Sequence, residues 1–325
     1  MKFSIIVPTY KRIEFLDKAI ESINAQTYRN YDIIVVNDNP NDKSIVDAFC
    51  SKFEKLIVCH SSHTKGGNGA RNLGISKSDG ELIAFLDDDD LWLPEKLEKH
   101  FEMHKQYPEA GLVFSDCLYI YNDPLVSDNA TCYNVPTDVV KAMGKAKFCP
   151  ATTSMVSIKR ECIERCGLFD ETLVSFQDWD YWFRIAHNFR FIHVPIILVH
   201  FRQHLGNRTS QNENDRLEGL KQICDKWKKE IEIKRFFRSW IRIFYYRNSL
   251  NALLAGDKST AFKKSLKLLN SKVICINSIR SFFSLLMHLS RRIVNYSKKT
   301  NKHLKDNHIL IIEFCYLFLQ IANYP

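Results

Sequence analysis

Short apolar runs alternate with helical patterns through the first hundred residues of the chain. Runs rich in β-branched and aromatic residues occur at FSIIV (3–7), DIIVVND (32–38), KLIVCH (55–60) and ELIAFLD (81–87). The segments between them, such as EFLDKAIESINAQ, place apolar residues at i, i+3 and i+4. This alternation predicts an α/β fold of Rossmann-like type, in which right-handed strand–helix–strand units form a mostly parallel sheet flanked by helices.

Polar residues follow three of the predicted strands at the point where each strand ends. Thr9 and Tyr10 follow the first run, Asp38 follows the second, and Asp87 to Asp90 follow the fourth. Ligands of open α/β sheets bind outside the carboxyl ends of the strands. We therefore expect these side chains to converge on one edge of the sheet and to form a binding site.

The stretch FLDDDDLWLP places four aspartates directly behind a buried strand. Carboxylates a few ångströms apart repel each other by about 1 kcal/mol per pair in water and by more at lower dielectric. A solvated turn, with Asp90 as N-cap of a helix in LPEKLEKHFEMH, explains one aspartate but not four. Carboxylates without His or Cys ligands favour a hard cation, so the run predicts bound Mg²⁺ or Mn²⁺ with open positions for a diphosphate.

Two further groups complete the predicted chemistry. Arg71, within GGNGARNLG, offers a planar cation for a phosphate or a base edge, although this glycine-rich loop matches neither common phosphate-binding fingerprint. Asp178 lies near the start of an aromatic helix in SFQDWDYWFRIA, where Asp180 and Arg184 have the spacing of a surface ion pair. Aromatic neighbours should raise the pKa of Asp178 and suit it to act as a general base, and the alternative is a simple N-cap.

The rest of this body mixes strands and helices, with YNDPLVSDNATCYNVPTD as a predicted loop. Charge then changes along the chain. The formal balance is 46 − 37 = +9 over 325 residues, but residues up to Ser210 sum to about −4 and the remainder to about +13. We predict a catalytic domain over 1–210, with halves 1–100 and 101–210, and a basic helical region over 211–325.

The basic region contains one clear amphipathic helix, IKRFFRSWIRIFYYR (233–247). Basic side chains fall on one side of the helical wheel and aromatic and aliphatic ones on the other, so this helix can lie on an anionic membrane surface or pack on the catalytic body. The run at 309–324 contains Glu313 and Gln320 and is shorter than the roughly 20 residues that a spanning helix needs.

Ten cysteines occur without any CxxC pair, and no secretory signal opens the chain. Cys162 and Cys166 have helical spacing but no second pair to complete a zinc site. We expect a cytoplasmic protein with reduced thiols and no nucleic-acid partner.

Five motifs, in order, carry a resemblance to a known family: IIVPTYKR, VVNDNPND, GARNLGISKSDGELIAFLDDDDLWLPEKL, CGLFDETL and QDWDYWFRIA. They resemble family-two inverting glycosyltransferases of the GT-A fold, over about residues 2–205. The resemblance implies a nucleotide-sugar donor bound near Thr9, Tyr10, Asp38 and Arg71. It implies a DxD motif at Asp87 and Asp89, with Asp87 and Asp88 on the donor side and Asp89 as metal ligand. Asp178 matches the family's base, and His204 resembles a histidine that some relatives carry near the metal.

Two departures from the family pattern concern the fit of the nucleotide. This chain has VNDNP where the family commonly has VDDGS, and it has Gln177-Asp178 where the family commonly has the acidic pair ED. The chain lacks the QxxRW motif of processive relatives, which favours addition of a single sugar. We therefore expect metal-dependent transfer of a hexosyl or N-acetylhexosaminyl group, from a UDP-sugar by preference. The expected acceptor is a lipid-linked or cell-surface glycan, and we expect the cytoplasmic protein to attach peripherally to the inner face of the membrane. A nucleotidyltransferase and a non-catalytic sugar-nucleotide or membrane-binding module are the alternatives.

Overall fold

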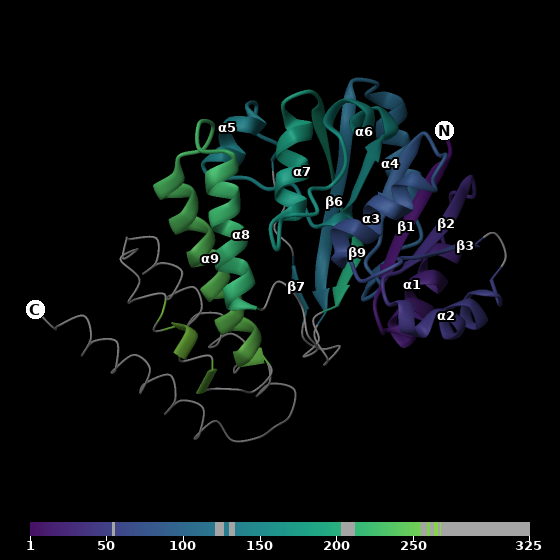
Figure 1. Cartoon of the computed structure of the whole chain (residues 1–325). Helices are drawn as coiled ribbons and strands as arrows, with labels where there is room; N and C mark the ends of the chain where they lie inside the picture. The colour runs from purple at the N-terminus through teal and green to yellow at the C-terminus, as the bar shows by residue number, and fades with distance from the viewer. Residues whose placement is uncertain are drawn as a thin grey trace, which may run out of the picture. The chain divides into compact units, whose positions relative to one another are not determined.

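The structure is a computed structural model, and it describes residues 1–53, 56–120, 127–129, 134–202 and 212–254, together with 259–260, 263–265 and 267. The chain divides into two compact units, residues 1–237 and 238–325. The boundary after Ser210 that the charge distribution suggested stays a prediction. Figure 1 shows that the labelled strands all lie within the first unit.

Nine strands of the described residues form one sheet, in the order β3-β2-β1-β4-β8-β6-β9-β5 with β7 paired to β6. Strands β1 to β4, β6 and β9 run in one direction, whereas β5, β7 and β8 run in the other. The predicted mostly parallel α/β sheet is therefore confirmed. The strands are β1 (Phe3–Thr9), β2 (Tyr31–Asn37), β3 (Leu56–His60), β4 (Leu82–Phe85), β5 (Asp90–Trp92), β6 (Ala110–Ile120), β7 (Ser127–Asn129), β8 (Val156–Lys159) and β9 (Arg190–Arg202).

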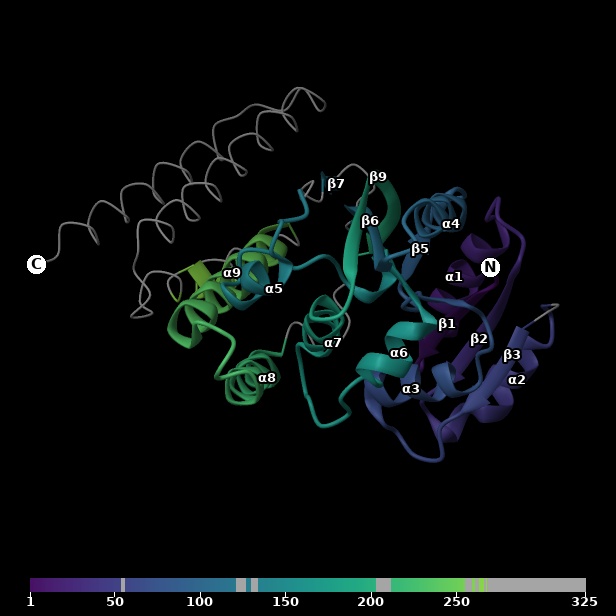
Figure 2. The same ribbon diagram turned by 90° about the horizontal axis from the view of Figure 1, so that it is seen from above.

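Helices flank both faces of this sheet, with α1 and α4 on one side and α3, α6 and α7 on the other (Figure 2). The α-helices are α1 (Ile13–Asn24), α2 (Lys43–Cys50), α3 (Gly66–Ser76), α4 (Lys96–Gln106), α5 (Val139–Gly144), α6 (Arg160–Cys166), α7 (Gln177–Ala186), α8 (Glu213–Lys226) and α9 (Ile233–Leu254). Two short 3-10 helices are η1 (Pro40–Asp42) and η2 (Thr153–Met155).

The central strands are apolar at successive positions because both of their faces are covered. On β1, Phe3, Ile5 and Val7 belong to a core that also contains Leu16 and Ile20 of α1. The intervening Ile6 faces α3 instead, since a β-carbon added at Gly74 would lie 2.5 Å from its Cγ2 atom. The sheet thereby holds the ends of β1, β2 and β4 in fixed relation to α3, which carries Arg71.

A row of buried polar groups on α4 is an exception to this apolar core. Lys96, His100 and His104 are each at most 1% exposed, and they stand one helical turn apart. His100 Nδ1 and His104 Nε2 lie 2.8 and 2.9 Å from Ser157 Oγ on β8, and Lys96 Nζ donates to the Met155 carbonyl at 3.2 Å. Hydrogen bonding offsets the cost of burying these groups and ties α4 to the segment Met155–Ser157.

The chain between the aspartate run and α4 differs from the prediction. Asp90 begins the short strand β5, and Glu95 stands at the N-cap of α4 without a side-chain capping bond. The expectation that Asp90 caps this helix is wrong. Within the predicted polar loop, Ser127–Asn129 form β7 as an added partner of β6.

The amphipathic helix predicted at 233–247 is confirmed as the first part of α9. Its Lys234, Arg235 and Arg238 are exposed and its Phe236 is buried, although Ile233 is 41% exposed despite its apolar character. The predicted run at 309–324 lies outside the described residues. Over the described part of the chain, every helix is too short or too polar to cross a bilayer.

Candidate active site

The four consecutive aspartates do not point in the same direction. One carboxylate oxygen from each of Asp87, Asp89 and Asp90 lies within 4.8 Å of the others. Asp88 instead accepts a hydrogen bond from Thr9 Oγ1 at 2.9 Å, which links the end of β1 to the end of β4. Burial raises the pKa of Asp88 to about 7, with Arg12 opposing the shift and Asp89 adding to it.

Three arginines neutralise this cluster from separate elements of the fold. Arg12 Nη1 lies 2.9 Å from Asp89 Oδ2 and 3.3 Å from Asp88 Oδ1. Arg71 of α3 pairs with Asp87 at 2.5 Å. Arg202 of β9 donates to the backbone carbonyls of Asp88 and Asp89, at 3.2 and 2.7 Å. The repulsion expected among four carboxylates is thus offset by positive groups that converge from distant parts of the sequence.

Asp90 is the most buried aspartate of the cluster and is held by neighbouring elements of the fold. It is fully buried, accepts a hydrogen bond from Ser154 Oγ at 2.6 Å, and pairs with Phe201 where β5 joins β9. The neighbouring Thr153 of η2 donates from Oγ1 to Asp87 Oδ2 at 3.2 Å. The segment before β8 therefore orients two of the three clustered carboxylates.

The carboxyl ends of β1 and β2 are joined by a hydrogen bond from Asp38 N to the Thr9 carbonyl at 3.0 Å. The Asp38 carboxylate accepts from the backbone of Lys65 at 3.0 Å and of Gly66 at 2.8 Å, where α3 begins. Gly66 has a φ of +73°, a conformation that favours glycine and lets the chain turn toward Asp38. Tyr10 stands at the surface, 42% exposed. The convergence predicted for Thr9, Asp38 and the aspartate run is confirmed.

Asn37, which departs from the acidic residue common in the resembled motif, has a role within the turn after β2. Its side-chain amide donates to the Asn39 carbonyl and to Asp42 Oδ1, both at 2.9 Å, and its Oδ1 atom accepts from Asn39 N at 2.9 Å. Asn37 therefore stabilises the turn and leaves Asp38 at the carboxyl edge of the sheet.

Asp178 lies in the first turn of α7, and its Oδ1 atom accepts from Trp179 N at 2.8 Å. Burial raises its pKa, as the aromatic surroundings predicted, while the charges of Arg216 and Arg71 lower it and that of Asp87 raises it. Arg71 and Asp87 are therefore close enough to Asp178 to act on its proton affinity. The structure brings together the predicted base, the predicted phosphate-binding arginine and the first aspartate of the run.

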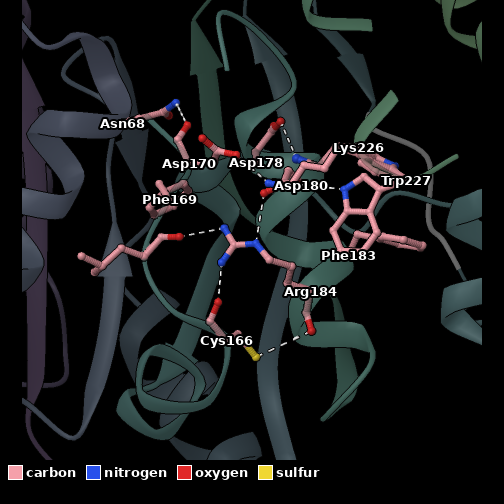
Figure 3. A network of polar contacts seen from close by, with 12 residues as sticks. Asn68, Cys166, Phe169, Asp170, Asp178, Asp180, Phe183, Arg184, Lys226 and Trp227 are labelled. Atoms are coloured by element: carbon pink, nitrogen blue, oxygen red, sulfur yellow. Dashed lines mark hydrogen bonds and ion pairs between the residues drawn. The ribbon is translucent and has the colours of Figure 1, made fainter. Parts of the chain in front are cut away.

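The neighbouring Asp180 is not the surface residue that its spacing with Arg184 suggested. The pair forms, with Arg184 Nε 3.0 Å from Asp180 Oδ2, but Asp180 is fully buried. Lys226 and Trp227 reach the same carboxylate from α8 and the residue after it, at 2.9 and 2.8 Å (Figure 3). Residues assigned to a basic C-terminal region on sequence grounds thus hold the helix that carries Asp178.

Several residues around the cluster were missed by sequence reasoning: Arg12, Thr153, Ser154, Arg202 and Arg216. Arg12 was detectable, because it follows the first strand within the quoted motif IIVPTYKR. The others lie between 63 and 129 residues beyond Asp87–Asp90, without a local signal that marks them. His204, predicted as a metal ligand, lies outside the described residues.

The donor set suits a hard divalent cation. Asp87, Asp89 and Asp90 offer carboxylate oxygens alone, the ligand type that Mg²⁺ and Mn²⁺ prefer, and the Arg12 guanidinium beside Asp89 shows that this position favours positive charge. The described cysteines are free thiols dispersed through the fold. Cys162 and Cys166 donate to separate backbone carbonyls, of Gly111 and Arg184.

Comparisons with known proteins agree with this arrangement. A family model described as Glycosyl transferase family 2 matches residues 4–152. An uncharacterized glycosyltransferase of Bacillus subtilis, YwdF, is 30% identical over 203 residues, which cover 61% of this chain and 73% of the relative. The uncharacterized glycosyltransferase MJ1057 of Methanocaldococcus jannaschii is 26% identical over 249 residues, 75% of this chain and 85% of the relative.

Two solved structures share the fold at low sequence identity. TarS 1-349 of S. aureus in complex with UDP-GlcNAc has a TM-score of 0.53 at 15% identity, covering 81% of this chain and 89% of that one. The mannosyltransferase PcManGT of Pyrobaculum calidifontis, in complex with GDP-Man and Mn²⁺, has a TM-score of 0.54 at 16% identity, covering 98% and 85%. The GT-A fold that the sequence motifs implied is confirmed.

Proposed function

Because this chain belongs to glycosyl transferase family 2 and is a glycosyltransferase of the GT-A fold, we propose that it transfers one sugar, with inversion, from a nucleoside-diphosphate sugar to an acceptor hydroxyl. One observation carries this proposal. The carboxylates of Asp87, Asp89 and Asp90 gather within 4.8 Å at the carboxyl edge of the sheet, and Arg71 and Asp178 lie close enough to Asp87 to interact with it electrostatically.

The donor side of the site is formed by the ends of β1, β2 and β4. Thr9, Tyr10 and Asp38 would contact the nucleoside, and Arg71 would contact its phosphates. The hydrogen bonds of Thr9 with Asp88 and with Asp38 support this by joining the three strand ends. A divalent ion, Mg²⁺ or Mn²⁺, would be held by Asp87 and Asp89, and when bound it supplies positive charge that makes the diphosphate a better leaving group. Asp90 accepts a hydrogen bond from Ser154, so its proposed role is to hold the chain that carries Asp87 and Asp89 in place. Arg12, which now pairs with Asp88 and Asp89, can turn to a phosphate oxygen.

The acceptor side is formed by the first turn of α7. Asp178 takes the proton of the acceptor hydroxyl while that oxygen forms a bond to the anomeric carbon. The bond from the anomeric carbon to the diphosphate oxygen breaks, and the electron pair leaves with the nucleoside diphosphate. A single displacement of this kind inverts the anomeric configuration. The raised pKa of Asp178 supports this role, because a base with higher proton affinity accepts a proton more readily.

The donor and acceptor are proposed by class. The structurally similar proteins hold UDP-GlcNAc in one case and GDP-Man in another, and we favour a UDP-hexose or UDP-N-acetylhexosamine. The acceptor would be a lipid-linked or cell-surface glycan, such as lipopolysaccharide, O-antigen or capsule. The exposed basic residues of α9 support peripheral attachment of a cytoplasmic enzyme to the inner face of a membrane.

A screen of nucleotide sugars by thermal unfolding tests the donor class. The full chain is heated with each of several UDP- and GDP-sugars, with and without Mn²⁺. A donor at 100 times its dissociation constant stabilises the fold by about 2.7 kcal/mol, and this gain should require the metal. Asp89→Ala serves as control, because it should remove the metal-dependent part alone. Stabilisation by no sugar nucleotide would contradict the proposal. Incubation with the stabilising donor separates the alternatives: release of pyrophosphate instead of nucleoside diphosphate would favour a nucleotidyltransferase, and binding without release of either would favour a non-catalytic module.

A further inference from the structure

Helix α8 touches the turn that precedes the proposed base. A β-carbon added at Gly219 would lie 2.6 Å from Ser175 Cβ and 2.9 Å from the Ser175 backbone nitrogen and oxygen. Contacts below 3.0 Å of this kind require the backbone to shift, so only glycine allows the two segments to approach so closely. The backbone of α8 is therefore packed directly against the residue three positions before Asp178.

Arg216 lies on α8 three residues before Gly219 and contacts the same Ser175–Phe176 turn. Its Nη1 atom donates to Ser175 Oγ at 2.9 Å, and its guanidinium carbon lies 3.7 Å from the centre of the Phe176 ring. Phe176 is 2% exposed and has a φ of +63°, the left-handed conformation that a bulky residue adopts only when its surroundings hold it there. Its carbonyl accepts the first hydrogen bond of α7, from Asp180 N at 2.9 Å.

We propose that Arg216 is a positioning residue for the transfer reaction, because it holds the Ser175–Phe176 turn from which α7 begins and thereby places the Asp178 carboxylate. The proposal rests on the function assigned above, in which Asp178 is the base. Arg216 lies in the segment 211–325 that charge alone would assign to a separate basic region.

The charge of Arg216 acts on Asp178 in addition to its contacts. The charged groups that act on this carboxylate are Arg216 of α8, Arg71 of α3 and Asp87 beyond β4. Burial raises the pKa of Asp178, and Arg216 opposes the rise more strongly than Arg71 does. Loss of the guanidinium should therefore move the titration of Asp178 to higher pH and leave less of the base ionised at a given pH.

Other contacts hold the fold of this region without Arg216. Gln222 accepts from Val174 N at 3.1 Å and donates to the Thr172 carbonyl at 3.0 Å. Lys226 bridges Asp170 and Asp180, at 2.6 and 2.9 Å (Figure 3). Since α8 and α7 keep these links, a change at Arg216 is expected to leave a folded protein with a displaced turn.

The test compares Arg216→Gln and Arg216→Lys in the full chain, with Lys221→Gln as matched control. Lys221 is on the same helix with a side chain 63% exposed, so the control removes one charge away from the turn. Hydrogen exchange of residues 174–180 reports on position. Hydrolysis of UDP-GlcNAc or GDP-mannose with Mn²⁺, which needs no acceptor glycan, reports on the base.

We expect Arg216→Gln to speed exchange over 174–180 at least fivefold and to lower kcat about tenfold with KM for the donor within twofold. The acidic limb of its pH–rate profile, where kcat falls as Asp178 becomes protonated, should move to higher pH by about half a pH unit or more. Arg216→Lys should restore the limb but only part of kcat, and Lys221→Gln should match the parent. Unchanged exchange in Arg216→Gln overturns the proposal, and so does an unchanged limb with an unchanged kcat. If Asp178→Asn retains turnover, the assignment of Asp178 as the base is wrong. If Asp178→Asn loses turnover while Arg216→Gln behaves like the parent, the base is right and only the proposed role of Arg216 is contradicted.

Discussion

Four identical residues in sequence acquire four environments in the fold. Asp87 faces Arg71 and Thr153, Asp88 faces Thr9, Asp89 faces Arg12, and Asp90 is buried against Ser154. Each environment follows from a partner that lies at least 16 residues away in the chain. Substitutions within the run should therefore differ in kind, and some should alter ligand binding while others alter stability.

Asp89→Ala is expected to abolish metal-dependent donor binding and to leave the fold intact. The carboxylate is lost from the cluster, and Arg12 keeps a partner in Asp88. Calorimetry with Mn²⁺ and UDP or GDP measures the effect. Metal-dependent binding of parental strength by this variant would contradict the assignment of Asp89 as metal ligand.

Asp90→Ala should mainly destabilise the protein. The change leaves the Ser154 hydroxyl without its acceptor in a fully buried place, which costs about 1–3 kcal/mol. Thermal unfolding without ligand separates this variant from Asp89→Ala, whose unfolding temperature should stay close to that of the parent. Equal unfolding temperatures for both variants would show that Asp90 is not a structural residue.

Asp178→Asn should keep donor affinity near normal and remove transfer, because a base acts on the acceptor's proton and not on the diphosphate. In the parent, the rate should fall as pH falls through a pKa that burial has raised above the ordinary 3.8 of an aspartate, since protonation inactivates the base. Initial rates of nucleoside diphosphate release across pH measure both effects. Turnover above about a tenth of the parental rate in the variant would exclude Asp178 as the base.

Sequence reasoning located the polar residues that directly follow strands, since topology alone brings strand ends together. Thr9, Asp38 and Asp87 were found in this way. It could not find Arg202, whose place beside Asp88 and Asp89 depends on β9 pairing with β5 across about a hundred residues. It also misplaced Asp90, because a capping residue and the first residue of a three-residue strand look the same in sequence.

At the scale of single elements, α4 combines an amphipathic sequence with a buried polar row that binds β8. His104 is 1% exposed, and burial lowers its pKa from 6.5 to about 3. The unfolded chain therefore binds a proton that the folded protein excludes. Stability is lost as pH falls below 6.5 and continues to fall toward about pH 3. Burial also lowers the pKa values of His100 and Lys96.

We expect the free energy of unfolding of the parent to fall by up to about 1.4 kcal/mol per pH unit below pH 6 because of His104. The free energy of unfolding of His104→Leu should fall less over the same range. Leucine is chosen because it fills much of the imidazole volume and cannot be protonated, while His100 remains to bond Ser157. Urea unfolding at pH 7 and pH 5 measures the difference. Parallel losses in the two proteins would show that His104 does not titrate on unfolding in this range.

Helix α8 shows why charge counts along a sequence can mislead at this scale. Net charge after Ser210 suggests a basic surface, yet Lys226 is engaged with Asp170 and Asp180, and Arg216 with Ser175. The acidic partners lie earlier in the chain, so a running sum of charge separates groups that the fold pairs. Lys221 on α8 and Lys228 and Lys229 just after it are exposed, and on α9 the exposed basic residues include Lys234, Arg235 and Arg238.

At the scale of the whole molecule, the membrane proposal concerns the exposed basic residues of α9 and not those of α8. Lys234→Gln, Arg235→Gln and Arg238→Gln combined in the full chain should weaken binding to vesicles rich in anionic lipid, measured by sedimentation, by about 1 kcal/mol of binding free energy per charge. High salt should weaken the parent in the same way. The control is a triple exchange of Lys99, Arg165 and Lys221, which lie on other helices. The proposal fails if the parent stays in the supernatant with acidic vesicles at low salt.

The pairing of Arg202 with the backbone of the aspartate run has a consequence for the order of synthesis on the ribosome. Residues 1–90 emerge first and contain β1 to β4 with their carboxylates, but β8, which covers the open edge of β4, and β9, which brings Arg202, emerge roughly 70 to 110 residues later. A nascent chain of this length holds a sheet whose β4 edge is unpaired, beside a concentration of negative charge that lacks one of its three arginines. Stalled chains of increasing length should therefore become resistant to protease only after β9 has left the exit tunnel, and the site and the sheet should mature in the same step of translation.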